Sequence, residues 1–574
     1  MNHATKVNSR LQRLQHWRYI RLLGGVCLLM LFLWVQYSIL TTDISSNPVD
    51  LHSTTKSDHL RGNDHLGQRY KVDIATNDST RGTAAWEELD KAIGMLADVE
   101  EPDKDVAAAP SAMQENRRLA VRKAMQFAWG NYEEHAFGGD ELYPKRGSNH
   151  SQVWGDIACT LVDSIDTLWI MDLKDEFQRA RDYVANHLDF SHLGRDENTV
   201  SVFETIIREV GGLLGAFDLS GDIIFKEKAV ELMDRLTPAY NEKEGVFYTL
   251  YNPFTKAKSF NHFAAYRAHI ADVGTLQLET RYLSDITGDS KYAQMGDAFY
   301  HIVKREGSHK KTGLFPVHFD SVSGKFDAQH SKLTLGALGD SFYEYLLKVY
   351  IYSAKRDEDK YLRELYDDAV RGIEEFLLFF SIPDDLYFLQ DLNLPSLSAV
   401  RSMDHLTCFV PGMLALGTLF ETDDHVKNAK HLELAEKLME TCYQLYRRQR
   451  TKLSPDIVSF PNMQATDQKH RLRPETIESL FYLYRATKNP KYREFGWNIF
   501  QALETHAKVK HGYAAILDVT EIPAQTEDKM ESFFLAETLK YHYLLQAPES
   551  LIPLDEYVFN TEAHPLRIRK KKLN

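Results

Sequence analysis

The chain has 574 residues, of which 43% are hydrophobic and 26% charged, and this suits a globular protein with a sizeable buried core. Its formal net charge of -14 at pH 7 argues against a nucleic-acid partner, because proteins that bind phosphate backbones present a basic surface. The four cysteines form no CxxC pair, so a disulfide-rich scaffold and a cysteine-based metal site are excluded.

The N-terminal segment predicts a membrane anchor. Residues 22–40 carry no charge and are long enough to cross the hydrocarbon core of a bilayer. Residues 1–21 contain five Lys or Arg residues and no acidic residue, so the positive-inside rule makes them a cytosolic tail. A cleaved signal peptide is the alternative, but its apolar region would be shorter and would end at a small-x-small cleavage site, which is lacking here. We therefore expect a single-pass type II membrane protein whose remaining chain is lumenal.

The lumenal part divides in two. Residues 41–110 are polar, acidic and poor in aromatic residues, with one short helix expected near Trp86, and they predict a stem. Residues 111–570 predict a domain made of helices, because apolar positions recur there every three to four residues and strand-like alternation is scarce. The glycosylation sequons that begin at Asn77 and Asn149 agree with a lumenal location.

The helical domain alternates two kinds of helix. Strongly apolar helices are expected at 158–172, 203–217, 266–286, 336–352, 411–420, 474–486 and 531–546. Amphipathic helices are expected between them, at 115–130, 176–188, 222–236, 291–304, 358–380, 427–447 and 491–505. Pairing of an apolar helix with an amphipathic one indicates an inner and an outer layer. The same periodicity fits both a closed ring of seven hairpins and an open solenoid.

Carboxylates near the ends of the apolar helices are the main functional signal, and in a closed ring they would gather at one mouth. They are Asp163, Asp166, Glu204, Glu279, Asp340, Asp404, Glu475, Glu478, Glu531 and Glu537. A carboxylate in apolar company, such as Glu204, needs a partner or a shifted pKa, and Arg208 one turn later is a natural partner. Grouped carboxylates fit glycoside hydrolysis or an oxygen-liganded calcium site. The motifs of zinc proteases, serine hydrolases, P-loop NTPases and dinucleotide-binding enzymes are absent.

Eight runs of sequence carry a more specific signal. They are TLVDSIDTL (160–168), SVFE (201–204), GTLQLE (274–279), GDSFYEY (339–345), MDHL (403–406), RPETIES (473–479), MESFF (530–534) and FNTEAHP (559–565). In this order they resemble the class I α-1,2-mannosidases, glycoside hydrolase family 47, over about residues 115–566. Each run alone is a moderate match, whereas eight in order are highly specific.

The resemblance implies an all-α fold, an (α/α)7 barrel that the C-terminal segment plugs at one end. It also implies an inverting exo-α-1,2-mannosidase that needs Ca²⁺ and removes terminal mannose from the high-mannose N-glycans of glycoproteins. By the matching motifs Glu204 would be the general acid, Glu475 the base that activates water, and Asp340 a third essential carboxylate. Inversion requires the working acid and base to lie roughly 6.5–9.5 Å apart, so that a water molecule fits between them and the sugar.

The same resemblance implies the binding residues. Thr561 would be the only direct protein ligand of calcium, through its carbonyl and hydroxyl oxygens, with waters and sugar hydroxyls completing the coordination. The substrate would contact Arg208, Glu279, Leu338, His405, Glu478, Phe533, Glu537 and Glu562, with the Phe533 ring stacked beneath the sugar. Cys408 and Cys442 match the positions of the family's disulfide, which leaves Cys159 as a free thiol.

Leu338 bears on specificity. Members of the endoplasmic reticulum stop after one mannose and carry an arginine two residues before the aspartate that Asp340 matches. Leu338 instead resembles the Golgi subgroup, which trims several residues toward a five-mannose glycan, because loss of a guanidinium removes hydrogen bonds and opens space. We therefore expect a Golgi membrane enzyme. The alternatives are single-mannose trimming in the endoplasmic reticulum, a lectin-like relative that acts in glycoprotein degradation, an (α/α) glycosidase for another sugar, and a structural solenoid.

Overall fold

The computed structural model describes residues 111–150, 153–195, 198–261, 267–421 and 424–570. The predicted cytosolic tail, membrane span and stem all lie outside these residues. Within them, no helix combines the length and apolar character that crossing a membrane requires. The first helix, α3 (Ala112–Ala136), begins at a capping box, in which the Ser111 hydroxyl accepts from the backbone of Gln114 and the Gln114 side chain accepts from the backbone of Ser111.

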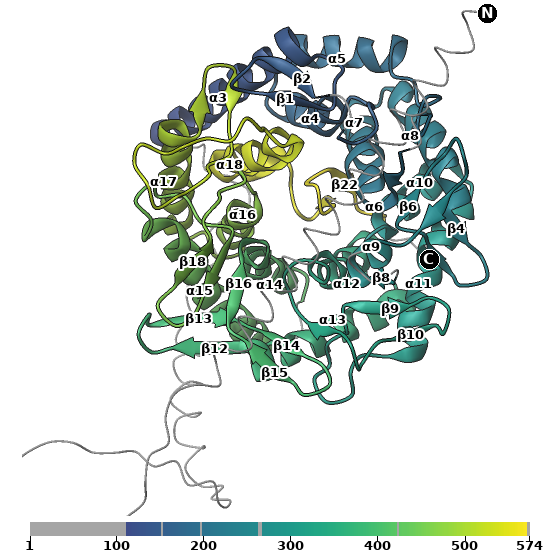
Figure 1. The fold of residues 1–574 in the computed structure, drawn as a ribbon, viewed down its shortest axis with the longest axis vertical. Coiled ribbons are helices and arrows are strands. Elements are labelled where there is room, and N and C mark those ends of the chain that lie inside the picture. Colours follow the sequence, from purple (N-terminus) through teal and green to yellow (C-terminus); the bar gives the residue numbers. More distant parts are fainter. Residues whose placement is uncertain (1–110, 151–152, 196–197, 262–266, 422–423, 571–574) are drawn as a thin grey trace, which may run out of the picture. The chain divides into compact units, whose positions relative to one another are not determined.

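Seven helices of the described chain form an inner ring (Figure 1). They are α4 (Cys159–Ile170), α7 (Gly211–Ser220), α10 (Gln277–Thr287), α12 (Asp340–Tyr352), α14 (Val410–Leu419), α16 (Glu475–Thr487) and α18 (Leu539–Gln546). Each of them contacts the next along the chain, and the π-helix η7 (Phe534–Thr538), which leads into α18, contacts α4. The ring is therefore closed, which decides between the two architectures that the periodicity left open.

Each inner helix packs against one outer helix, as the interior and exterior positions in Figure 1 show. The outer helices are α3 with α18, α5 (Lys174–Asn186) with α4, α8 (Ile223–Leu236) with α7, α11 (Lys291–Glu306) with α10, α13 (Lys360–Gly372) with α12, α15 (His425–Arg447) with α14, and α17 (Lys491–His506) with α16. All eight residues of α18 are buried, whereas α5 buries Phe177, Ala180 and Val184 on a single stripe. This contrast confirms the predicted inner and outer layers.

Close approach in the ring depends on the first two residues of α7, which are both glycines. A Cβ on Gly212 would lie 2.6 Å from the carbonyl oxygen of Val162 on α4, and a Cβ on Gly211 would lie 2.6 Å from the side-chain nitrogen of Asn560. Both contacts are far shorter than van der Waals distance. The absence of a side chain therefore lets α7 approach both its neighbour in the ring and the C-terminal segment inside it.

Short antiparallel strands that the sequence analysis did not predict lead the chain into the inner helices. Four sheets have three strands each: β3 (Val200–Ser201), β6 (Leu250–Tyr251) and β7 (Lys258–Ser259); β8 (Ala268–His269), β9 (His318–Asp320) and β10 (Lys325–Phe326); β11 (Lys332–Leu333), β14 (Asp391–Asn393) and β15 (Ser398–Val400); and β16 (Ser402–Asp404), β17 (Ile457–Ser459) and β18 (Gln464–Asp467). β3, β8, β11 and β16 come shortly before α6 (Val202–Thr205), α9 (Ile270–Gly274), α12 and the 3-10 helix η6 (His405–Phe409), respectively. The sheets thus lie before the N-terminal ends of four inner helices, namely α7, α10, α12 and α14.

Apart from one pair near the C-terminus, the remaining strands form two-stranded hairpins in the connections. They are β1 (Glu141–Tyr143) with β2 (Ser148–His150), β4 (Tyr240–Asn241) with β5 (Val246–Phe247), β12 (Leu378–Ser381) with β13 (Leu386–Leu389), and β19 (Lys508–Val509) with β20 (Gly512–Tyr513). The helix predicted at 358–380 is too long, because α13 passes into the π-helix η5 (Ile373–Leu377) and the strand β12 begins at Leu378.

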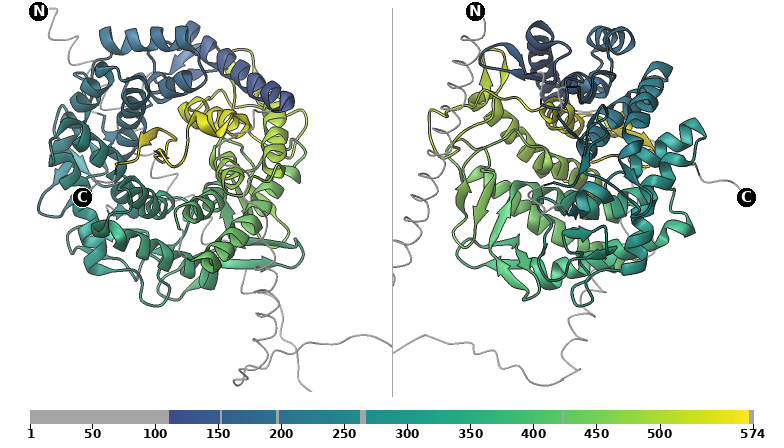
Figure 2. Two further views of the ribbon diagram at one scale, coloured as in Figure 1. Left: turned by 180° about the vertical axis from the view of Figure 1, so that it is seen from behind. Right: turned by 45° about the vertical axis from the view of Figure 1, so that its right-hand side comes forward.

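The C-terminal segment lies inside the ring, as both face-on views show (Figures 1 and 2). It consists of β21 (Tyr557–Phe559), a turn over residues 560–564 and β22 (Pro565–Arg567). The Asn560 side chain donates to the Ile207 carbonyl and to Glu279 of α10, and Lys540 of α18 donates to the Ala563 carbonyl. Hydrogen bonds from several inner elements therefore hold the turn, as expected for a plug.

Candidate active site

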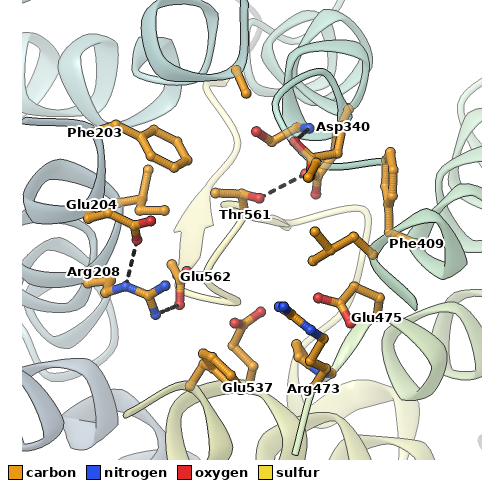
Figure 3. A pocket seen from close by; sticks show the side chains of 18 of the residues that line it. Phe203, Glu204, Arg208, Asp340, Phe409, Arg473, Glu475, Glu537, Thr561 and Glu562 are labelled. Atoms are coloured by element: carbon orange, nitrogen blue, oxygen red, sulfur yellow. Dashed lines mark hydrogen bonds and ion pairs between the residues drawn. The ribbon is translucent and has the colours of Figure 1, made fainter. Parts of the chain in front are cut away.

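A cavity of about 450 Å³ lies in the ring beside the plug (Figure 3). It is lined by Ser201, Phe203, Glu204, Ile207, Arg208, Asn261, Ala271, Asp272, Ala337, Leu338, Asp340, Ser341, Glu344, Leu406, Phe409, Arg473, Pro474, Glu475, Glu478, Phe533, Glu537, Thr561 and Glu562. These residues come from the N-terminal ends of inner helices, from the loops before them and from the plug. The gathering of carboxylates at one mouth, expected for a closed ring, is therefore observed for five of the predicted residues: Glu204, Asp340, Glu475, Glu478 and Glu537.

One side of the cavity is built around Arg208. It lies on the π-helix η1 (Ile206–Val210), and its Nε is 2.9 Å from Glu204 Oε2, so the predicted pairing one turn apart is confirmed. Its Nη1 is 2.7 Å from Glu562 Oε2 on the plug. Burial opposes the charge of this guanidinium, but Glu562, Glu204 and Asp163 together raise the pKa of Arg208. Arg208 is therefore a permanent cation that joins Glu204 to the plug.

Asp340 begins α12 on another side of the cavity. Its Oδ1 accepts from the backbone N–H of Ser341 at 2.9 Å. Burial raises the pKa of Asp340 to about 8, and the negative charges of Asp404, Glu344 and Glu475 add to this shift. Asp340 therefore carries a proton at neutral pH.

Glu475 begins α16 and lies across the cavity from Glu204 (Figure 3). Its Oε2 is 2.7 Å from Nδ1 of His405, the first residue of η6. His405 Nε2 in turn contacts the Tyr446 hydroxyl at 2.6 Å. The Glu475 carboxylate is thus supported from behind by a buried imidazole while it faces the cavity.

Thr561 lies at the centre of the cavity, on the turn of the plug (Figure 3). Its hydroxyl donates to Glu344 Oε2 at 3.0 Å, and its backbone N–H donates to the Tyr345 hydroxyl at 3.3 Å. Within the described chain no donor contacts its carbonyl oxygen. Glu344 is bonded on its other side to Lys348, one turn further along α12. The plug therefore presents two threonine oxygens to a carboxylate-rich cavity.

The cavity has an excess of negative charge. Among the described residues that line it there are eight carboxylates but only two guanidinium groups. Burial raises the pKa of Glu478, Glu537 and Glu562, and repulsion from neighbouring carboxylates adds to each shift. A cation bound there would relieve this repulsion. The described residues contain no group of three or more His, Cys, Asp or Glu placed to hold a metal ion. A hard cation in this cavity would thus need the Thr561 oxygens, water and ligand oxygens.

Two π-helices supply charged residues to the cavity. Arg208 lies on η1 and Glu537 on η7, and each π-helix continues directly into an inner helix. A π-helix inserts an extra residue into the helical turn, which rotates the following side chains, and such bulges are frequent at functional sites. In this molecule they allow a long inner helix to bury its apolar stripe and still direct a charged group into the cavity.

Two of the expected substrate-binding residues do not line the cavity. Glu279 is fully buried and accepts from the Tyr345 hydroxyl and from the Asn560 side chain, so it supports the plug. His405 is buried behind Glu475. The other expected residues, Arg208, Leu338, Glu478, Phe533, Glu537 and Glu562, do line it. Both residues were expected from the family resemblance, and a matching motif does not by itself fix how deep a side chain lies in the ring.

Several other inner-helix carboxylates also lie away from the cavity. Asp163 and Asp166 on α4 are completely buried and contact His564 of the plug. Asp404 caps η6 by accepting from the backbone and hydroxyl of Thr407, and Glu531 pairs with Lys529. These four carboxylates therefore bind neighbouring protein groups around the site and do not line the cavity.

The structure also reveals lining residues that the sequence analysis did not select. Glu344 follows Asp340 by four residues and Lys348 follows Glu344 by four, so one face of α12 carries all three. This spacing could have predicted from the sequence that Glu344 lies beside Asp340. Arg473 directly precedes the Pro474-Glu475 pair and is bonded to Asp456 at 2.7 Å. Asp272, on the short helix α9, gave no comparable signal.

The disulfide between Cys408 and Cys442 is present, as expected, and it links η6 to α15. Cys159 is a free, buried thiol. The bond fixes the segment that carries His405 to an outer helix, so it contributes to the wall behind Glu475.

A cavity with carboxylates on opposite sides has the groups that hydrolysis of a glycosidic bond needs. Hydrolysis of a glycoside needs one carboxyl group to protonate the leaving oxygen and another to activate water. The lining residues offer both, together with an aromatic ring at Phe533 that a sugar face can stack on.

Comparison with known proteins identifies the family. The sequence profile described as glycosyl hydrolase family 47 matches residues 124–568. A solved structure of the α-1,2-mannosidase from Trichoderma reesei is similar with a TM-score of 0.73 and 27% identity, covering 80% of this chain and all of that one. The mannosyl-oligosaccharide alpha-1,2-mannosidase IA of Spodoptera frugiperda is 41% identical over 81% of this chain and 69% of its own length.

Further relatives agree. The mannosyl-oligosaccharide 1,2-alpha-mannosidase MNS1 of Arabidopsis thaliana is 41% identical, over 88% of both chains. The human endoplasmic reticulum mannosyl-oligosaccharide 1,2-alpha-mannosidase is also 41% identical, over 79% of this chain and 64% of its own length. With the profile match over most of the chain, these similarities show that the protein is a glycoside hydrolase and belongs to glycosyl hydrolase family 47.

Proposed function

We propose that this protein is an inverting exo-α-1,2-mannosidase that removes several terminal α-1,2-linked mannose residues from high-mannose N-glycans, toward a five-mannose product. The observation that carries this proposal is the pair Glu204 and Glu475 on opposite sides of one cavity, in a member of family 47. The mannosyl-oligosaccharide 1,2-α-mannosidase activity is supported by the names of the relatives, which share 41% identity with this chain.

The plug supports exo action. Residues 560–564 lie inside the ring, and Thr561 and Glu562 line the cavity, so the plug would keep a glycan chain from passing through on that side. A terminal mannose would enter from the side of the three-stranded sheets. An endo-acting enzyme would instead need a groove that is open at both ends.

In the reaction Glu475 removes a proton from water, and the water oxygen forms a bond to the anomeric carbon. The bond from that carbon to the leaving oxygen breaks on the opposite face, and Glu204 delivers a proton to the leaving oxygen, directly or through water. Arg208 and Glu562 hold Glu204 in place. Asp340, whose pKa is raised to about 8, would keep its own proton at neutral pH and so spare the site another negative charge.

We also propose that the cavity binds Ca²⁺. The chemistry of the residues fits this ion, because the site combines excess carboxylates with the hydroxyl and carbonyl oxygens of Thr561. Thr561 would be the direct ligand, and Glu478, Glu537 and Glu562 would hold the surrounding waters. When bound, the ion would grip two sugar hydroxyls and help to hold the ring in a distorted form.

Leu338 supports multiple trimming. It lines the cavity, and an uncharged side chain there leaves room for more than one glycan branch. The relatives at 41% identity include both an endoplasmic reticulum enzyme and enzymes of type IA, so identity alone favours neither subgroup. The alternative is release of a single mannose. Because Leu338 resembles the Golgi subgroup, we propose a Golgi membrane location, and the sequence features of residues 1–40 lead us to propose a single-pass type II protein.

The full-length protein should be incubated with a nine-mannose glycan, with calcium or with a chelator, and the products followed by mass. Release of several mannose residues in calcium and loss of release in chelator is the expected result. No release in calcium contradicts the proposed mannosidase activity, and release of one residue only contradicts the multiple-trimming proposal.

Glu475→Gln should abolish turnover and leave glycan binding measurable, because it removes the base and keeps the shape of the side chain. Loss of both turnover and binding would assign Glu475 a structural role.

A further inference from the structure

The catalytic cavity is connected to the outer layer of the ring by three side chains in series. Glu475 Oε2 lies 2.7 Å from His405 Nδ1, and His405 Nε2 lies 2.6 Å from the hydroxyl of Tyr446 on α15. Both His405 and Tyr446 are only 2% exposed. Neither residue lines the cavity, so neither is placed to contact a sugar there.

Hydrogen bonding determines where the imidazole proton lies. An ionised Glu475 can only accept, so His405 Nδ1 must carry a hydrogen that it donates to the carboxylate. In the neutral ring Nε2 is then an acceptor, and the Tyr446 hydroxyl is the donor that satisfies it. The Thr476 hydroxyl lies 3.1 Å from the same nitrogen. The tyrosine therefore favours the one neutral tautomer in which His405 can donate to Glu475.

The backbone around this series is fixed on both sides. His405 N–H donates to the Asp456 carbonyl at 2.8 Å. The disulfide joins Cys408, three residues after His405, to Cys442, one helical turn before Tyr446. The covalent link thus holds η6 and α15 in the register that brings the imidazole and the phenol together.

We propose that Tyr446 is a positioning residue for the catalytic base, acting through His405. It fixes the imidazole in the tautomer and orientation in which Nδ1–H holds Glu475 Oε2, so that the other carboxylate oxygen faces the water to be activated. The inference rests on the proposed role of Glu475 as base. It also replaces the expected role of His405 as a substrate contact with a role in orienting Glu475.

The chain offers a matched control. Tyr443 lies on α15 nearly one turn before Tyr446, and both line a second cavity, of about 420 Å³, between α15 and α17. The Tyr443 hydroxyl accepts from the Asn498 side chain at 3.0 Å, and its ring stacks on Phe495 with centroids 3.7 Å apart. Tyr443→Phe therefore removes a hydroxyl from the same helix and cavity without touching His405.

The experiment measures kcat and KM of the full-length protein on a nine-mannose glycan. Tyr446→Phe should lower kcat roughly tenfold, the equivalent of one hydrogen bond, and leave KM within about twofold. Tyr443→Phe should leave both constants unchanged. Equal effects of the two substitutions, or a loss confined to KM, would overturn the proposal.

A double-mutant cycle separates positioning from general stability. His405→Gln should lower kcat by itself, and Tyr446→Phe should then cause no further loss, because the phenol acts only through the imidazole. Additive losses would overturn the proposal. If Tyr446→Phe fails to fold, 3-fluorotyrosine at position 446 keeps the hydrogen bond and alters its strength; a change in kcat there, but not with the same substitution at 443, supports the inference, and no change overturns it.

The failure of this inference is distinguishable from failure of the proposed function. A wild-type protein that releases no mannose contradicts the function itself. An active wild type, inactive as Glu475→Gln but unaffected by Tyr446→Phe, contradicts only the positioning role.

Discussion

Leu338 lines the cavity and has a backbone φ of +80°, a conformation that residues other than glycine rarely adopt. Its carbonyl accepts from the Ala271 N–H at 3.2 Å, and the Ala337 N–H donates to Asp404 at 3.2 Å, so the surrounding loop is held on both sides. Strain that persists in a firmly held loop is common at functional sites. The direction of the Leu338 side chain is therefore set by the loop and is independent of its own chemistry.

This independence makes Leu338→Arg a clean test of specificity. Arginine and leucine are both unbranched at Cβ, so the backbone cost of the positive φ is unchanged. A guanidinium in the cavity should hydrogen-bond one glycan branch and exclude others, and the variant should stop after one mannose. Product masses over time measure this, with Leu338→Met as the uncharged control. Continued trimming by Leu338→Arg would contradict a specificity role for this position.

Asp340 predicts the alkaline limit of activity. Its pKa is raised to about 8 by burial, so it is protonated below that pH and adds a further negative charge to the cavity above it. We expect kcat/KM to fall as pH rises through about 8. Asp340→Asn should lower kcat by about two orders of magnitude, and its remaining activity should no longer fall as pH rises through about 8, because asparagine cannot ionise. A fall that persists in the variant would assign the titration to another carboxyl group, such as Glu478.

At the scale of elements, the plug is held to α4 by buried charges. His564 Nδ1 lies 2.9 Å from Asp166 and Nε2 lies 3.1 Å from Asp163, and all three side chains are inaccessible to solvent. Both ring nitrogens can donate only when the imidazole is protonated. Burial opposes that charge, but Asp166 and Asp163 raise the pKa of His564. Lys540 adds a second cation, 2.9 Å from Asp166.

His564→Gln should therefore destabilise the domain strongly, by about 3–5 kcal/mol, because it leaves buried carboxylates short of a cation. Chemical denaturation monitored by circular dichroism measures this, and His330→Gln, at an exposed histidine, is the control with no expected change. Because the pKa of His564 is raised on folding, its stabilisation of the folded state is complete at pH values below the ordinary histidine pKa. The stabilisation is lost as pH rises through the pKa of His564 in the folded state. Equal unfolding free energies for the two variants would contradict the role of His564 as an anchor.

At the scale of the whole molecule, the ring concentrates carboxyl groups in its interior. Burial raises the pKa of Asp340 to about 8 and that of Glu279 to about 7. Between the ordinary carboxyl value and these values the unfolded chain releases protons that the folded chain retains, so folding becomes less favourable as pH rises. A bound cation would offset this cost.

We expect the Tm of the calcium-free protein to fall between pH 5 and pH 8, and calcium to raise Tm more at pH 8 than at pH 5, because binding to the folded state alone stabilises it. Thr561→Val, which keeps the shape and removes the hydroxyl, should weaken the calcium effect. Differential scanning calorimetry with and without chelator measures both. A calcium effect of equal size in Thr561→Val would place the ion elsewhere.

Sequence reasoning predicted the repeating helices well and the connections poorly. The fourteen ring helices lie near the predicted ranges because burial on one face imposes a period of 3.6 residues over many turns. The strands are two to four residues long, too short for alternation to appear, so the helix predicted at 358–380 runs into residues 378–380, where β12 begins. In the site, the Glu204–Arg208 pair followed from helical spacing, whereas the contact between His405 and Glu475 joins residues 70 positions apart and has no local signal.

The sequence by itself determined the two layers, the family resemblance and the carboxylates that the inner helices carry, because these depend on local periodicity and on motifs. Tertiary structure decided the closure of the ring, the position of the plug and the depth of each charged side chain. It brought Glu204, Glu475 and Thr561 to one cavity, and it withdrew Asp163, Asp166 and Glu279 to the plug. The physical reason is that the environment of a carboxylate depends on neighbours from distant segments, and only a closed fold brings those neighbours together.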